Sequence, residues 1–144
     1  MPETNKAKFN EVEKKIISSR LTGLSICQLK EDDSRLVADQ IILKAAYIIG
    51  CPTPETEFYA EGLAKEMMEY LGEFGFSELT LAEIILAFRF NTKGGLRFPS
   101  GLEVERVCFS GTCFNVDFLS KVLSNYMALR NILDRKIENF IDGY

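Results

Sequence analysis

The residues of this chain that are best suited to bind a metal or form a disulfide are four cysteines, Cys27, Cys51, Cys108 and Cys113. The sequence contains no histidine, so a zinc site would require thiolates alone or thiolates with carboxylates. Cys108 and Cys113 are separated by four residues, which is wider than the usual two-residue spacing of a zinc knuckle. A chain of 144 residues with many apolar side chains also needs no disulfide framework. We therefore expect no metal, and we expect Cys108 and Cys113 to be reduced thiols that are buried or half-buried.

Acid–base catalysis at neutral pH most often uses histidine, and its absence excludes the common serine and cysteine triads. Pairs of carboxylates could still do this work, but acidic residues that recur along a helix usually face solvent. Gly94 and Gly95 lack both a preceding strand pattern and the spacing of a phosphate-binding loop. The sequence therefore predicts no catalytic residue, no cofactor and no enzymatic activity.

The stretch from Arg89 to Phe109 could contact phosphates and bases, because it interleaves cations with Phe90, Phe98 and Phe109. Cations neutralise phosphates, and aromatic rings stack on exposed bases. Phenylalanines in an irregular segment more often anchor that segment to the core, and nearby glutamates dilute the positive charge. We expect anchoring. The alternative is a nucleic-acid-binding or partner-binding site made by Arg89, Lys93, Arg97, Phe98 and Arg106.

The charge of the chain is unevenly distributed. The formal net charge is −4 and the isoelectric point is near 5.0, which argues against a protein whose main task is to coat nucleic acid. Residues 55–83 contain eight glutamates and one lysine, a local charge of −7, so the rest of the chain is net positive. Such a run usually forms a solvated helix face. Its sharper interpretation is a docking surface for a basic partner, made by Glu61, Glu66 and Glu69.

Hydrophobic periodicity places these residues on helices and predicts a mainly α fold, a compact bundle of about five helices. We interpret the chain as one domain, residues 1–144, with residues 1–4 flexible and residues 92–114 forming an irregular loop or a short β-hairpin before the last helix. The expected helices span residues 5–20, 33–50, 56–71, 80–91 and 117–141, with the second beginning at Asp33 or Ser34, the third at Pro54 or Thr56, and the last after Asn115 or Asp117.

Periodicity also predicts which side chains face the core. In the third helix, Phe58 is expected to point inward together with an apolar stripe, and the glutamates are expected to point outward; that stripe comprises Leu63, Met67, Tyr70 and Leu71. The start of the fourth helix has the spacing of a capping box, with Thr80 and Glu83 satisfying each other's backbone amides.

In the last helix, Tyr126 and Arg130 lie four residues apart and share a face. We expect Tyr126 at the edge of the core with Arg130 covering it. A groove for a partner is the alternative.

Two segments carry a family resemblance, Leu79 to Arg89 and Phe118 to Arg130. They resemble small proteins of bacteriophages and mobile elements from gut bacteria, some of which are similar to replication accessory proteins, including helicase loaders. The resemblance covers roughly the C-terminal half of the chain. The chain lacks the ATP-binding signature of nucleotide-driven loaders, so the resemblance implies an adaptor or inhibitor and carries over no catalytic residue.

The sequence thus favours a non-enzymatic adaptor that binds a protein partner, and the resemblance implies a partner in phage or mobile-element DNA replication. The start of the chain lacks the apolar core of a signal peptide, and the longest apolar run is too short to cross a bilayer, so we expect a cytoplasmic protein, in the host cytoplasm if a phage encodes it. The alternatives are a single-stranded nucleic-acid-binding protein and a structural or virion component that self-associates through the last helix. The oligomeric state stays open.

Overall fold

The computed structural model describes residues 9–93, 96–97, 103–104, 106–109 and 114–142. Within these residues the chain forms five α-helices and a short 3₁₀ helix. In chain order they are α2 (Glu11–Arg20), η1 (Ile26–Gln28), α3 (Glu31–Ile49), α4 (Glu57–Glu73), α5 (Leu81–Lys93) and α6 (Val116–Asp142).

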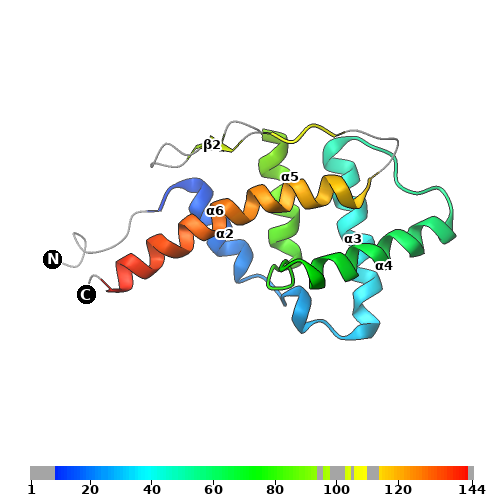
Figure 1. Ribbon diagram of the computed structural model, residues 1–144, viewed down its shortest axis with the longest axis horizontal. Coiled ribbons are helices and arrows are strands. Elements are labelled where there is room, and N and C mark those ends of the chain that lie inside the picture. The colour runs from blue at the N-terminus through cyan, green and yellow to red at the C-terminus, as the bar shows by residue number, and fades with distance from the viewer. Residues whose placement is uncertain (1–8, 94–95, 98–102, 105, 110–113, 143–144) are drawn as a thin grey trace.

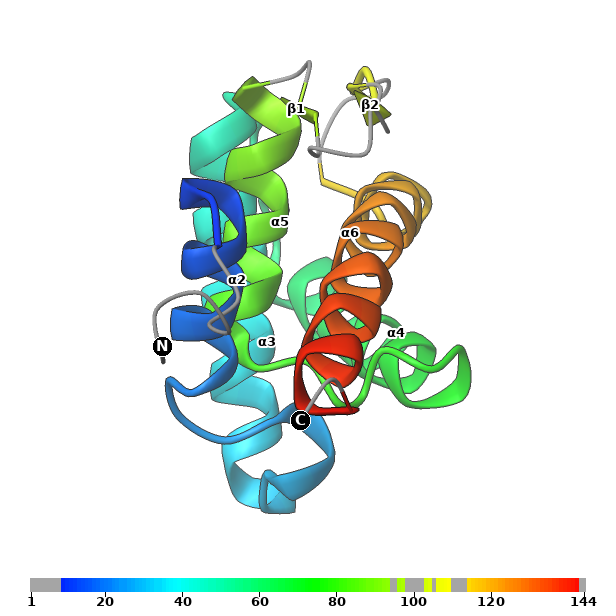
Figure 2. The same ribbon diagram turned by 90° about the vertical axis from the view of Figure 1, so that its left-hand side faces the viewer.

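The helices form two layers. In Figures 1 and 2, α2, α5 and α3 lie side by side, and α6 and α4 run across one face of that layer. Helix α5 is the centre of this arrangement, because it packs against α2, α3 and α6. Helix α4 completes the second layer by packing against α3 and α6. The prediction of a mainly helical bundle is confirmed.

Local capping explains where several helices begin and end. Asn10 and Glu13 form a reciprocal capping box at the start of α2, and the hydroxyl of Thr56 accepts a hydrogen bond from the backbone of Tyr59 at the start of α4. Gly50 ends α3 in the left-handed conformation, with φ of 74°. These signals stop the chain from extending each helix into the next.

Helices α3 and α4 each extend two residues beyond one of their predicted ends. Helix α3 begins at Glu31 because the first turn, with three acidic residues, interacts favourably with the positive end of the helix dipole. Helix α4 continues through Gly72 to Glu73, and the left-handed Gly75 follows it. The expected start of the first helix, residues 5–8, and the expected flexible residues 1–4 lie outside the described residues.

The segment before α6 contains two strands of two residues each, β1 (Leu96–Arg97) and β2 (Glu103–Val104), which pair in antiparallel register. The residues that connect them lie outside the described part of the chain. The pairing of the two strands is therefore shown, whereas the turn that would make them a hairpin stays a prediction. Beyond this, Val107 is held to the end of α5, because its backbone amide donates to Asn91 at 2.7 Å and its carbonyl accepts from Asn91 at 3.1 Å.

No described helix is long and apolar enough to span a membrane. One hydrophobic cluster joins all five helices. The largest of its completely or almost completely buried side chains come from every part of the chain and include Ile16, Ile41, Met67, Phe88, Phe114 and Tyr126. The phenylalanine rings of α5 and α6 contact one another, with 5.8 Å between the centroids of Phe88 and Phe118. Each such ring buries a large apolar area, so the cluster supplies most of the driving force for folding.

A carboxylate lies within this apolar cluster. Glu83 of α5 is completely buried, and its Oε1 accepts the backbone amide of Thr80 at 3.3 Å, which confirms the predicted capping box. Its Oε2 accepts the Tyr126 hydroxyl at 2.7 Å and the Arg130 Nε at 2.9 Å. Both partners come from α6. The carboxylate thus caps its own helix with one oxygen and binds the neighbouring helix with the other.

Burial changes two sequence expectations. Glu83 belongs to the acidic run but contributes nothing to a solvated face, because its charge is balanced by Arg130 inside the protein. Tyr126 and Arg130 share a face as predicted, yet both are buried, so they form neither the rim of the core nor a groove for a partner. Burial, together with the Glu83 carboxylate, raises the pKa of the Tyr126 hydroxyl above its ordinary value of 10.0.

Two further polar contacts attach α6 to α2. The buried Glu13 accepts the Lys136 Nζ at 2.9 Å, and the ammonium group of Lys136 lies 5.0 Å from the ring centroid of Phe9. Arg20, at the end of α2, donates to Asp134 at 2.8 Å. Because these contacts are directional, they select one rotation of α6 about its own axis.

The first prediction concerns the Glu83 carboxylate. Glu83→Ala should lower the free energy of unfolding by about 3–5 kcal/mol, because it leaves the Arg130 charge buried without its partner and removes a helix cap. Glu66→Ala, on the exposed face of α4, should change it by less than about 0.5 kcal/mol. Urea titration followed by circular dichroism measures both. Equal effects would contradict the buried network.

The second prediction concerns pH. The folded pKa of Tyr126 lies above the unfolded value, so the folded protein keeps a proton that the unfolded chain releases above about pH 10. The contribution of the hydroxyl to stability should be constant below pH 9 and should fall as the pH rises beyond about 10. The difference in unfolding free energy between the wild type and Tyr126→Phe, measured from pH 7 to 11, reports this. A difference that stays constant to pH 11 would show that the pKa is not raised.

Candidate functional site

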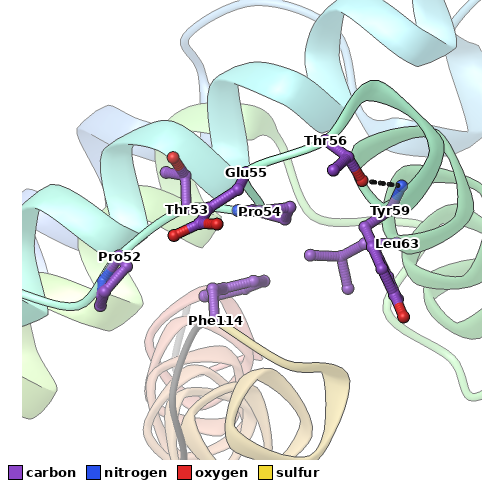
Figure 3. Close-up of a pocket in the computed structure, with 8 residues that line it drawn as sticks. All are labelled: Pro52, Thr53, Pro54, Glu55, Thr56, Tyr59, Leu63 and Phe114. Carbon is purple, nitrogen blue, oxygen red and sulfur yellow. Dashed lines mark hydrogen bonds between the residues drawn. The ribbon is translucent and has the colours of Figure 1, made fainter.

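A concavity with exposed apolar walls lies where the loop before α4 meets the start of α6. It has a volume of about 490 Å³ and is lined by residues 52–56, Tyr59, Leu63 and Phe114. Figure 3 shows Leu63 directed toward Phe114 across the pocket, with Pro52 and Pro54 along one side. Phe114 is itself buried, and its backbone amide lies 3.4 Å from the Pro52 carbonyl. The floor is therefore part of the hydrophobic core, and the wall is a proline-restricted loop.

This pocket continues onto the outer surface of α4. A shallower hollow is lined by Phe58, Gly62 and neighbouring residues, and it shares Tyr59 and Leu63 with the first. Gly62 has open space where a side chain would lie, which leaves a gap beside the two rings. We call the combined feature the α4 surface, made by residues 52–56, Phe58, Tyr59, Gly62, Leu63 and Phe114.

The prediction that Phe58 points into the core is wrong. Phe58 is 82% exposed and Tyr59 is 70% exposed, and the two rings meet edge to face with their centroids 6.0 Å apart. The buried stripe of α4 consists of Ala64, Met67 and Leu71. Phe58 precedes Met67 by nine residues, which at about 100° per residue places the two on opposite sides of the helix. Neither ring belongs to the hydrophobic cluster that the described residues form.

Acidic side chains surround the α4 surface. Glu55 lines the deeper pocket, and Glu61 and Glu66 line the shallower hollow together with Lys65. Glu69, the third member of the predicted acidic face, is exposed on α4 but lines neither. The structure thus brings Glu61 and Glu66 to the edge of an exposed apolar area. The sequence pattern predicted the acidic groups and missed the aromatic residues between them.

One of the acidic residues at the start of α4 is already paired. Glu57 accepts Arg35 of α3 at 2.7 Å, and Arg35 also donates to Asp39 at 2.9 Å. These hydrogen bonds raise the pKa of the Arg35 guanidinium, with the bond to Asp39 contributing most. Within the described residues, Glu55, Glu61 and Glu66 make no ion pair. Their charge is available to a partner.

The residues of the predicted basic site are divided between two places. Arg89 and Lys93 line a groove between α5 and α2, whereas Arg106 lines a different hollow beside α6. The side chain of Arg97 and the whole of Phe98 lie outside the described residues. Of the other phenylalanines, Phe90 is buried and Phe109 packs edge to face on Phe118 with centroids 5.3 Å apart, so anchoring is confirmed for both.

Of the three cysteines that the structure describes, Cys27 and Cys108 are exposed and Cys51 is half-buried. Cys108 is exposed, so the prediction that it is buried or half-buried is wrong; the segment 106–109 is held through its backbone and through Phe109, and the thiol is left on the outside. Cys113 lies outside the described part of the chain. Among the described residues, no three metal-ligating side chains come together.

Comparison of the chain with protein-family models, with curated protein sequences and with solved structures gave no match.

The third prediction tests whether the aromatic residues of α4 face outward. Phe58→Ala should change the free energy of unfolding by less than about 0.5 kcal/mol, because an exposed ring buries little area on folding. Met67→Ala, from the buried stripe of the same helix, should cost about 2–5 kcal/mol. Thermal or urea unfolding of the two variants distinguishes them, and a large loss for Phe58→Ala would place its ring in the core.

Proposed function

We propose that this chain is a non-enzymatic adaptor that binds a partner protein through the α4 surface. One observation carries the proposal: two adjacent aromatic side chains, Phe58 and Tyr59, are exposed beside an apolar pocket. Aromatic residues are enriched among the side chains that dominate binding energy at protein interfaces. An exposed apolar area with a polar edge is typical of a surface that another protein covers.

The chemistry of the surface indicates the chemistry of the partner. The pocket of about 490 Å³ beside Tyr59 can accept a large apolar side chain, and the rim formed by Glu55, Glu61 and Glu66 favours lysine or arginine. A short amphipathic helix that carries a large apolar side chain and a lysine or arginine would fit this surface, because many proteins bind such helices in apolar grooves. The rim would speed association and exclude acidic partners, and the aromatic residues would supply most of the affinity.

The resemblance of residues 79–89 and 118–130 to phage and mobile-element accessory proteins supports a partner in DNA replication. In that setting the chain would recruit or inhibit a replication protein without chemical turnover. This part of the proposal depends on the resemblance alone, because the α4 surface constrains the chemistry of the partner and not its pathway.

The fourth prediction is a crosslinking experiment. Benzoylphenylalanine incorporated in place of Phe58 should form a specific crosslink to a host protein when the full chain is illuminated in its native cell extract. The same group in place of Tyr47, an equally exposed aromatic residue of α3, is the matched control and should give no such product. Identical products at both positions would show that exposure alone determines the crosslink.

Charge reversal then tests the rim. Glu61→Lys, Glu66→Lys and Glu69→Lys together should abolish the crosslink from position 58. Reversal of three exposed acidic residues elsewhere, Glu31, Asp33 and Glu138, produces the same change in net charge and should leave it intact. An undiminished crosslink after reversal on α4 would remove the acidic rim from the recognition. Circular dichroism of each variant verifies that it is folded.

A further inference from the structure

A second feature, independent of the α4 surface, lies along the seam between α2 and α5. The two helices run in opposite directions. At one end, the Thr80 hydroxyl before α5 donates to the Ser19 carbonyl near the end of α2 at 2.8 Å, and at the other, Lys93 at the end of α5 lines the same groove as Glu11 at the start of α2. Between these points a groove of about 340 Å³ follows the seam. Its α5 side extends from Leu86 to Lys93, about 10 Å at 1.5 Å per residue.

Three cations line this groove. Lys15 comes from α2, and Arg89 and Lys93 come from α5; all three are exposed, and none makes an ion pair with another described residue. Glu11 is the acidic residue that lines the groove, and Lys14 lies 3.6 Å from its carboxylate. The local charge is therefore positive although the chain as a whole is acidic.

Helix stability explains part of this cluster. Lys93 lies in the last turn of α5, where a cation interacts favourably with the negative end of the helix dipole. Lys15 lies in the middle of α2, where the dipole gives no such benefit, and it still lines the same groove as Arg89. Two helices thus contribute positive charge to one channel.

The apolar residues of the groove distinguish between two kinds of anionic ligand. Three apolar residues line it: Leu86 and Phe90 are each only 7% exposed, and Val12 is half-buried against the core, so none offers a large exposed side chain to a partner. A protein partner usually needs an exposed apolar or aromatic anchor, which this groove lacks and the α4 surface has. Apart from Glu11, the polar groups that line the groove are the three cations and the hydroxyls of Ser18 and Ser19, and these groups suit phosphate oxygens.

We propose that the groove between α2 and α5 binds the phosphodiester backbone of a single nucleic-acid strand through Lys15, Arg89 and Lys93. Contact is with phosphates, and the bases are not read, because Phe90 is buried and cannot stack on them. The proposal retains Arg89 and Lys93 from the predicted basic site, adds Lys15, and leaves out Arg106, which lies at another hollow.

The test is fluorescence anisotropy of a labelled oligothymidylate of about twelve nucleotides with the full chain, at salt concentrations from about 20 to 200 mM. Three phosphate contacts predict that log K falls with log salt with a slope of about −2, since each contact on a single strand contributes about −0.7. Lys15→Gln should make the slope shallower by about 0.7. Lys15→Gln, Arg89→Gln and Lys93→Gln together should weaken binding at low salt at least about tenfold.

The matched control removes the same charge elsewhere. Lys44→Gln, Lys65→Gln and Arg135→Gln replace three exposed cations on α3, α4 and α6 and should leave the affinity within about twofold of the wild type. Equal losses in both triple variants would show that net charge and not the groove determines binding, and no binding by the wild type at low salt would also overturn the proposal. Polyglutamate that competes as well as unlabelled oligothymidylate would assign the groove to acidic proteins instead. None of these outcomes affects the crosslink from position 58.

Discussion

The Glu83 carboxylate is the interaction on which the arrangement of the helices depends. A buried charge is costly unless it is paired and fully hydrogen-bonded, and Glu83 meets that condition only when the backbone of Thr80, the Tyr126 hydroxyl and the Arg130 guanidinium all surround it. Two of these partners lie on α6. The correct docking of α6 on α5 is therefore a requirement for burying the carboxylate, and other rotations of α6 would leave it unpaired.

The position of α6 in turn determines both candidate surfaces. Phe114, just before α6, forms the floor of the pocket at the α4 surface, and α4 packs directly on α6. On the other side, the contacts of α6 with Glu13 and Arg20 hold α2 beside α5. Figure 2 shows α2 and α4 on opposite sides of the molecule. The acidic, aromatic surface and the cationic groove are thus separated by the core, which would permit a protein and a nucleic-acid strand to bind at the same time.

Local signals in the sequence were sufficient for the helices and insufficient for the contacts between them. The number of helices was predictable because its signals are local. Gly50 ends one helix, Thr80 caps the start of another, and the apolar residues of α6 recur every three or four positions. The role of Glu83 was only half visible, since its capping bond spans three residues whereas its bonds to α6 span 43 and 47. Phe58 is apolar like the residues of the core, but its angular position on α4, opposite the buried Met67, leaves its ring exposed. The groove between α2 and α5 required the antiparallel pairing of two helices separated by about sixty residues, which no local pattern encodes.

The claim that the α4 surface is an apolar area open to solvent can be tested most directly by fluorine NMR of the chain labelled with 4-fluorophenylalanine, in the presence of a soluble paramagnetic probe. The signals are assigned by replacing single phenylalanines with leucine. At low protein concentration the probe should strongly broaden the signals of the exposed Phe58 and Phe74. The signals of the buried Phe88 and Phe118 should stay narrow, because the probe cannot reach them. A Phe58 signal that is protected as well as that of Phe88 would contradict the account, because the chain itself would then already cover the proposed binding surface.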